Sequence, residues 1–269
     1  MPKLLDEAAV RTVLRTRMFG RVVRFSRTLD STNSEAKRLA RTGSPEGTLV
    51  LAEHQSHGRG RWSRSWESPL GKGLWFSLIL RPDLEPDAVP MITLMAANAA
   101  AGAVESYSGE AVQVRWPNDL FVKDRKLAGI LTEMSQSERN LRFVILGIGI
   151  NVNQKPSDFP PDIRDRSISL SMACGRILER LPLFSEILVR LEKDYRAALR
   201  VGFRPVLRKW IARSGLEKRN VEIKTASETH RVRIEDFSDR GEWIVRTDHG
   251  RRIRFATGSI REVVDASGR

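Results

Sequence analysis

The hydrophobic pattern of this chain changes once, near residues 214–219, and this change limits the possible folds more than any other feature. Before it, apolar segments of strand length alternate with segments of helical periodicity. After it, the segments VEIKT, RVRIE, EWIVR and RRIRF are short and alternating, with turn signals at Asp239–Gly241 and Asp248–Gly250. We therefore predict two domains, an α+β domain over residues 1–215 and a small all-β domain over residues 216–269.

The first part of the chain contains the elements of a sheet flanked by helices. The segment Met91–Val104 is so rich in Ala, Met and Leu that we expect a helix buried on most sides. Thr32 and Glu35 have the spacing of a capping box and predict the start of an earlier helix. A turn at Lys123–Arg125 joins two strands. Further strands are predicted at Arg21–Phe25, Thr48–Ala52, Leu74–Leu80, Val112–Trp116 and Leu141–Ile150, and further helices at Phe184–Ala198 and Pro205–Ala212.

Composition excludes several classes of protein. The longest apolar candidate that we identify, Phe143–Val152, is shorter than the roughly 18 residues of a membrane span. The single cysteine, Cys174, forms neither an internal disulfide nor a cysteine-based zinc site, and the first residues contain no apolar leader, so we expect a cytoplasmic protein. The net charge of +13 suits nucleic acid, nucleotide phosphates or an acidic partner, although most of the basic residues are expected on solvated surface.

The segment HGRGRWSRSW, His57–Trp66, is the most informative for chemistry. Its glycines allow the backbone to approach an anion, while Arg59, Arg61 and Arg64 place positive charge beside it. A basic surface loop is the alternative. The Walker order of residues is absent, and GIGINV at Gly147 lacks the third glycine of a dinucleotide fingerprint. The segment therefore predicts a phosphate site of another kind.

Three further segments are candidate ligand-binding sites. Asp119 and Lys126 lie near strand ends in RWPNDLFVKDRKLAGIL, where sheet proteins often assemble sites, although an ordinary charged hairpin explains them too. DSTNS at Asp30–Ser34 places hydroxyls and an amide at a helix start, where capping is the simpler explanation. The glycines of GIGIN, Gly147–Asn151, let a flat group lie against a buried strand, and tight packing explains them equally well.

The order and spacing of these segments closely resemble biotin protein ligases. The matching segments are STN, QxxHGRGRxxRxWxSPxGxGLWFS, WPNDL, RKLAGIL and GIGIN, which cover roughly Leu29–Val152, with a looser resemblance to Arg261. Arg115 departs from the pattern, because Lys more often precedes WPND. The resemblance implies a mixed sheet flanked by helices, as in class II aminoacyl-tRNA synthetases, followed by a small SH3-like β-barrel. It also implies the activity of a biotin–[biotin carboxyl-carrier protein] ligase.

By this resemblance, the biotin-binding residues are Ser31, Thr32, Asn33, Gln55, Arg59, Gly60, Arg61 and Lys126. The residues implied at the ATP and adenylate site are Arg59, Arg61, Trp66, Asp119, Lys126, Gly129 and Asn151. Lys126, Arg59 and Arg61 carry the catalytic role, because they neutralise charge as the biotin carboxylate attacks the α-phosphorus and pyrophosphate departs.

The implied reaction has two steps, formation of biotinyl-5′-AMP and transfer of biotin to a lysine. ATP and biotin are the substrates, Mg²⁺ helps to bind the ATP phosphates, and no metal bound directly by protein side chains is expected. The partner is the carrier domain of acetyl-CoA carboxylase or a related carboxylase. About 30 residues precede Ser31, too few for the DNA-binding domain of some relatives, so we expect no specific DNA binding. No membrane partner is expected, and both a monomer and a homodimer stay open.

Three other functions remain as alternatives. A lipoate ligase or acyltransferase of the same superfamily would bind a similar acyl adenylate, but HGRGRW and GIGIN favour biotin. A nucleic-acid-binding protein is suggested by the charge and the terminal barrel, but only two tyrosines are present and most phenylalanines lie in apolar runs. A metal hydrolase is weaker still, because His54 and His57 are three apart but no further histidine lies nearby in sequence.

Overall fold

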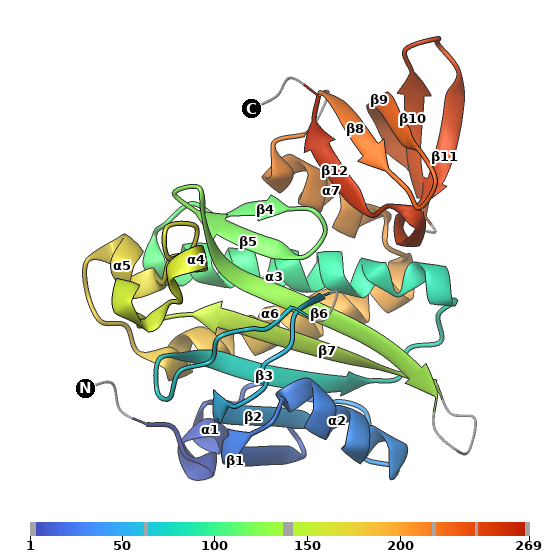
Figure 1. Cartoon of the computed structure of the whole chain (residues 1–269). Helices are drawn as coiled ribbons and strands as arrows, with labels where there is room; N and C mark the ends of the chain where they lie inside the picture. The colour runs from blue at the N-terminus through green and yellow to red at the C-terminus, as the bar shows by residue number, and fades with distance from the viewer. Residues whose placement is uncertain (1–3, 62–63, 137–141, 217–218, 240–241, 267–269) are drawn as a thin grey trace.

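The fold, taken from a computed structural model, is described for residues 4–61, 64–136, 142–216, 219–239 and 242–266. Figure 1 shows a large mixed sheet with helices on both faces and a separate small β domain at the C-terminal end. The large sheet has the strand order β1-β2-β3-β7-β6-β5-β4, in which only β1 and β2 pair in parallel. Its strands are β1 (Val23–Leu29), β2 (Leu49–Gln55), β3 (Gly73–Leu80), β4 (Gln113–Arg115), β5 (Asp119–Val122), β6 (Arg125–Gln136) and β7 (Arg142–Asn151). The predicted mixed sheet is confirmed.

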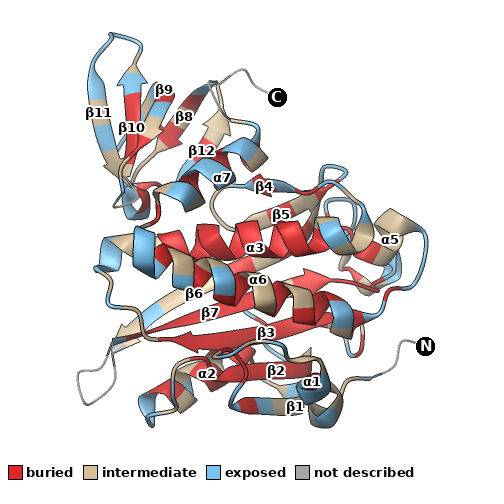
Figure 2. Cartoon of the chain, turned by 180° about the vertical axis from the view of Figure 1, so that it is seen from behind, coloured by how far each residue is buried: buried red, intermediate tan, exposed pale blue. Residues whose placement is uncertain are grey.

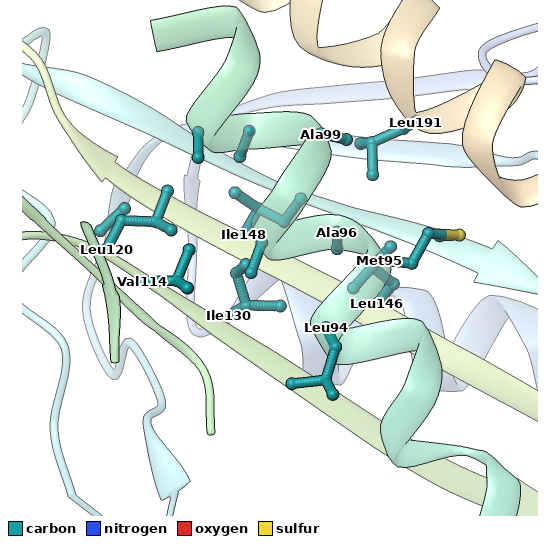
Figure 3. Packing of buried hydrophobic residues seen from close by; sticks show 14 of the residues in the cluster. Leu94, Met95, Ala96, Ala99, Val114, Leu120, Ile130, Leu146, Ile148 and Leu191 are labelled. Carbon is teal, nitrogen blue, oxygen red and sulfur yellow. The ribbon is translucent and has the colours of Figure 1, made fainter. Parts of the chain in front are cut away.

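Successive side chains of each strand point to opposite faces of this sheet, and the two faces have separate cores. On one face α2 (Thr32–Arg41) covers a small cluster that includes Val50, Ile79 and Ile145. On the other face, α3 (Pro90–Ser108) and α6 (Arg180–Val201) cover the main core, and Figure 2 shows α3 in red, the colour of buried residues, along most of its length. Figure 3 shows side chains of α3 meeting those of the strands in this core.

Helix α3 is the most apolar element of the chain. By length and composition, the stretch Pro86–Ser108 could cross a membrane, but 78% of its most apolar 18-residue segment is buried inside the protein. The expectation that no apolar run approaches that length was therefore wrong for this stretch. The helix ends at Gly109, which adopts the left-handed conformation at φ 76°. Its all-round apolar composition is explained by its position between the sheet, α6 and α7 (Arg204–Ser214).

The C-terminal domain is an antiparallel sheet with the order β11-β10-β9-β8-β12. Its strands are β8 (Asn220–Lys224), β9 (Thr229–Phe237), β10 (Glu242–Thr247), β11 (Arg252–Ala256) and β12 (Glu262–Asp265). The first four strands match the predicted alternating segments, whereas β12 was not predicted because only four residues carry its pattern. Helix α7 ends at Ser214 and β8 begins at Asn220, so the boundary that we propose at 215/216 falls between them.

Several details differ from the sequence prediction. Strand β1 is shifted to Val23–Leu29, and α1 (Glu7–Val13) was not predicted. The predicted capping box at the start of α2 is wrong, because Ser31 is the N-cap and Glu35 instead forms an ion pair with Arg38. Two short helices, α4 (Pro161–Arg164) and α5 (Leu170–Cys174), lie between β7 and α6. Three-residue 3-10 turns occur at η2 (Pro86–Ala88), η3 (Pro156–Asp158) and η4 (Thr257–Ser259).

Candidate functional site

The basic, glycine-rich segment between β2 and β3 folds back on itself as a narrow hairpin. The amide of Trp66 donates to the carbonyl of Gly58 at 2.9 Å, and Arg59 forms an isolated bridge with Ser65. A Cβ at Gly58 would lie 2.3 Å from the Trp66 carbonyl oxygen, so a glycine is required there. The hairpin therefore carries Arg59 and Trp66 on its two legs, with Arg61 near its tip.

The segment at the start of α2 joins a buried polar network rather than capping the helix. The side chain of Ser31 makes no cap hydrogen bond. The amide and hydroxyl of Thr32 donate to Gln55 Oε1 at 2.8 and 3.1 Å, and Gln55 Nε2 donates to Ser68 Oγ at 2.8 Å. All four residues are buried. Because their donors and acceptors are already oriented, this network suits recognition of a small polar ring.

Asn33 extends the same network to the basic hairpin. Its Nδ2 donates to Glu133 Oε2 at 2.8 Å, and its Oδ1 accepts from Ser77 Oγ at 2.7 Å. Glu133 also lies 4.0 Å from the Arg59 guanidinium. A Cβ at Gly147 would lie 1.9 Å from Asn33 Oδ1, so the glycine makes room for this amide. The DSTNS and HGRGRW segments therefore meet in space.

Two glycines on neighbouring strands form a flat floor under the indole of Trp66. Gly129 of β6 and Gly149 of β7 are direct partners in the sheet. A Cβ at Gly149 would lie 2.6 Å from Trp66 Nε1, and one at Gly129 would lie 3.0 Å from its Cζ3. Trp66 also meets Trp75 edge to face, with ring centroids 6.2 Å apart. The flat group expected against the glycines is thus an aromatic side chain of the chain itself.

Lys126 and Asp119 form the charged part of the site. Lys126 Nζ lies 2.7 Å from Asp119 Oδ2 and 5.6 Å from the centre of the Trp66 ring. Asp119 Oδ1 is buried without a hydrogen-bond partner among the described residues. Burial lowers the pKa of the Arg61 guanidinium, while the nearby Asp119 carboxylate raises it and Arg64 lowers it. Lys126, Asp119 and the Trp66 ring therefore lie together, with Arg61 near enough to interact electrostatically with Asp119, an arrangement suited to a phosphate with a flat base.

Asn151 stands apart from this group, because its amide is already bound elsewhere. Its Nδ2 donates to the carbonyl of Ile168 at 3.2 Å, and its Oδ1 accepts from Gln154 at 2.8 Å. The Ile168 amide in turn donates to the Lys126 carbonyl at 3.0 Å. Asn151 therefore supports the segment that holds the backbone of Lys126, rather than facing the ligand space directly.

The structure adds residues that the sequence analysis did not single out. The buried Ser68 and Ser77 and the half-buried Glu133 complete the polar network around residues 31–33 and Gln55. For Ser77, the signal in the sequence was a polar residue inside the apolar segment LWFSLIL, which indicates a buried hydrogen bond. Arg61 also lines a cavity of about 480 Å³ together with residues 225–227 and 258–261 of the C-terminal domain. The site therefore borders both domains.

Comparison with known proteins gives consistent results. Residues 25–151 match the sequence model of the biotin/lipoate A/B protein ligase family. The chain is 39% identical over 249 residues to the bifunctional ligase/repressor BirA of Bacillus subtilis, covering 93% of this chain and 77% of that protein. It is 32% identical to a biotin–[acetyl-CoA-carboxylase] ligase of Paracoccus denitrificans, covering 83% of this chain and 94% of that protein.

The fold is also shared with solved structures. A biotin protein ligase from Aquifex aeolicus, in complex with biotin and ATP, superposes with a TM-score of 0.75 at 24% identity. That comparison covers 91% of this chain and all of the other chain, so both domains are included. The sequence relatives, the matched residues 25–151 and the common fold agree, and the chain belongs to the family of biotin protein ligases.

Proposed function

We propose that this protein joins biotin to ATP, forming biotinyl-5′-AMP and pyrophosphate, and then transfers biotin to a lysine of a biotin carboxyl carrier protein. One observation carries the proposal for the site. Lys126, Asp119 and Trp66 come from two distant segments and meet beside the basic hairpin, where an acyl phosphate and an adenine ring need a cation and an aromatic surface. The family relationship supports the same reaction.

We assign the biotin head to the network of Ser31, Thr32, Asn33 and Gln55. A ureido ring presents two N–H donors and one carbonyl acceptor, and burying it is favourable only where each finds a partner. The buried hydroxyls and amides of this network offer both kinds of partner. Arg59 and Gly60 would close over the valeryl chain from the hairpin.

In the first step, a biotin carboxylate oxygen attacks the α-phosphorus of ATP, and the bond from that phosphorus to the β-phosphate bridging oxygen breaks. The electron pair of that bond leaves with pyrophosphate. Lys126 and Arg61 stabilise the negative charge that accumulates on the phosphoryl oxygens. Asp119 holds the Lys126 ammonium at 2.7 Å, so its position is set before the substrates arrive. Trp66 would provide the surface for the adenine ring.

In the second step, the amine of the acceptor lysine attacks the carbonyl carbon of biotinyl-5′-AMP, and AMP leaves with the electron pair of the broken C–O bond. The amine must lose a proton. Asp119 Oδ1 is our candidate to receive it, since this buried oxygen has no partner among the described residues. The chain provides no nucleophile in this scheme, so positioning and electrostatics carry the catalysis.

Magnesium would enter this site with the ATP phosphates. Within the described residues, no group of three or more His, Cys, Asp or Glu side chains is placed to hold a metal ion. Mg²⁺ often keeps several waters and binds largely through substrate phosphates, so the ATP phosphates would carry the ion here. The ion would supply further neutralisation of phosphate charge. The free thiol of Cys174 fits the cytoplasm that we propose as the location.

The test is incubation with ATP, Mg²⁺ and either biotin or lipoate, followed by detection of the acyl adenylate and of a labelled carrier domain. We expect labelling with biotin. Labelling with lipoate alone would assign the chain to the lipoate branch of the family and overturn the proposal. Lys126→Ala should lower the yield of biotinyl-5′-AMP by about 100-fold or more, because a charge partner of the transition state is lost.

Lys123→Ala is the matched control for Lys126→Ala. Lys123 lies three residues away and is bound to Glu110 and the Ala173 carbonyl, outside the site. Adenylate formation by this variant should stay within about twofold of the unmodified protein. Near-normal adenylate formation by Lys126→Ala, with an unchanged unfolding temperature, would remove Lys126 from the catalytic role.

A further inference from the structure

A basic groove lies on the side of the large sheet opposite the biotinylation site. Its walls are residues 15–17, which follow α1, and one face of α6, and it encloses about 480 Å³. The two sides of the sheet are distinguished by neighbouring residues of β3: Phe76 packs on Phe184 of α6, whereas Trp75 packs on Trp66. The groove is therefore separated from the ligand space by the full thickness of the sheet.

The groove is a fixed part of the fold. The carboxylate of Glu192 in α6 accepts from the backbone amides of Arg17, Met18 and Phe19 at 2.8, 2.7 and 2.8 Å. Glu192 is only 6% exposed, and three charge-assisted hydrogen bonds of this kind attach the segment firmly. Glu192 is the only acidic residue among those that line the groove, and its carboxylate is hydrogen-bonded to the backbone.

Five basic side chains line the groove, Arg15, Arg17, Lys193, Arg196 and Arg200, and all are exposed. Across the described part of the chain, none of these five side chains has an ion-pair partner. The other basic residues nearby behave differently, as the pairs Arg190–Glu186, Lys209–Asp194 and Arg213–Glu105 show. Unpaired positive charge is therefore concentrated in the groove rather than spread evenly over these helices.

The distribution of charge along the sequence also places most of the positive surplus in the domain that carries the groove. Residues 216–269 contain 12 Lys and Arg against 10 Asp and Glu, so the surplus of +13 lies mainly in the first 215 residues. The biotinylation site uses a few of these charges. The groove holds five more that the proposed function does not use.

The chemistry of the lining indicates the ligand. Arginine presents a planar fork that binds phosphate in bidentate fashion. The remaining lining residues are Thr16, Val189, Glu192 and Ala197, so no aromatic side chain is available to stack on a base. Lys193, Arg196 and Arg200 follow one another along an exposed stripe about 10 Å long, which is enough to contact neighbouring phosphates of one strand. We propose that this groove binds the phosphodiester backbone of a nucleic acid strand without sequence preference.

Binding is tested with the full chain and a fluorescently labelled 20-nucleotide single strand, by anisotropy across a series of KCl concentrations. The groove variant combines Lys193→Ala, Arg196→Ala and Arg200→Ala. The control variant combines Arg208→Ala, Arg252→Ala and Arg254→Ala, which removes the same charge from exposed side chains that are ion-paired. The groove variant should bind at least tenfold more weakly, and the slope of log K against log salt should fall by about 2. The control should stay within about twofold.

Four results would overturn the proposal. The first is an equal loss in both variants, which would mean that net charge alone governs binding, and the second is no loss in the groove variant. The third is displacement of the strand by tripolyphosphate at a lower phosphate concentration than by unlabelled strand, which would identify a compact polyphosphate. The fourth is slower carrier biotinylation with normal adenylate formation in the groove variant, which would make the groove a carrier docking surface. Because adenylate formation is measured separately, failure of the proposed ligase activity is distinguishable from each of these.

Discussion

At the scale of single residues, Gly149 shows how closely the site is packed. A methyl group at this position would lie 2.6 Å from Trp66 Nε1, whereas one at its partner Gly129 would lie 3.0 Å from the edge of the same ring. Gly149→Ala should therefore displace the indole and weaken ATP binding about tenfold or more, in line with the cost of overpacking a core. Gly129→Ala should have the smaller effect. Titration calorimetry with ATP in the absence of biotin measures both, and unchanged affinity in Gly149→Ala would contradict the packing role.

At the scale of an element, α6 has a buried face that contains one strongly shifted ionisable group. The Tyr195 hydroxyl donates to Glu46 Oε1 at 2.6 Å, and burial together with Glu46 raises the pKa of Tyr195 well above its ordinary value. The folded protein then keeps a proton that the unfolded chain loses near pH 10. The free energy of unfolding therefore falls as the pH rises above about 10.

Tyr195→Phe tests this titration. The variant should be about 1 kcal/mol less stable at pH 8, because one hydrogen bond is lost, and this difference should shrink between pH 9 and 11. Urea unfolding at several pH values gives the free energies. Tyr107→Phe is the control, since burial also raises the pKa of Tyr107 but its hydroxyl bonds a backbone carbonyl at an exposed position. A constant difference between pH 8 and 11 for Tyr195→Phe would contradict the prediction.

At the scale of the whole molecule, three tryptophans join the two sheets. Trp116 follows β4, Trp210 lies in α7 and Trp243 lies in β10, with ring centroids 5.1 to 6.2 Å apart. Ion pairs from Arg204 and Arg208 of α7 to Asp236 of β9 lie beside them. Trp116 belongs to the same segment as Asp119, so the attachment of the C-terminal domain is linked directly to the site.

Trp243→Ala should destabilise the protein by about 3–5 kcal/mol, the usual cost of removing a fully buried tryptophan. Because this tryptophan bridges both sheets, we also expect the single unfolding transition to split into two. Differential scanning calorimetry measures both effects. Phe255→Ala, at a half-buried ring of β11 against His230, is the comparison and should cost less. One cooperative transition in Trp243→Ala would show that the domains are coupled elsewhere.

Most of the fold could be predicted from the sequence, because its long elements have clear periodicity. The α3, α6 and α7 helices and the strands around Gly73–Leu80 and Arg142–Asn151 follow the predicted segments within a few residues. Helix α1 and strand β12 were missed, because their seven and four residues are too few to show a reliable period. The capping box was wrong because Ser31 is the N-cap, and the Thr32 and Asn33 side chains are bound by Gln55 and Ser77 instead.

The sequence by itself determined the two-part architecture, the glycine-rich basic segment and the polar residue types needed for an acyl adenylate, because these depend on local pattern and on residue chemistry. Only the tertiary structure decided which of those residues meet. Pairing of β6 with β7 places Gly129 opposite Gly149 under Trp66. The hairpin brings Arg61 towards Asp119, which binds Lys126. Asn151, by contrast, is hydrogen-bonded to the Ile168 carbonyl and supports the segment behind Lys126. The basic groove likewise depends on Glu192, which holds residues 17–19 on a helix more than 170 positions away. Such long-range contacts follow from packing, which no local pattern encodes.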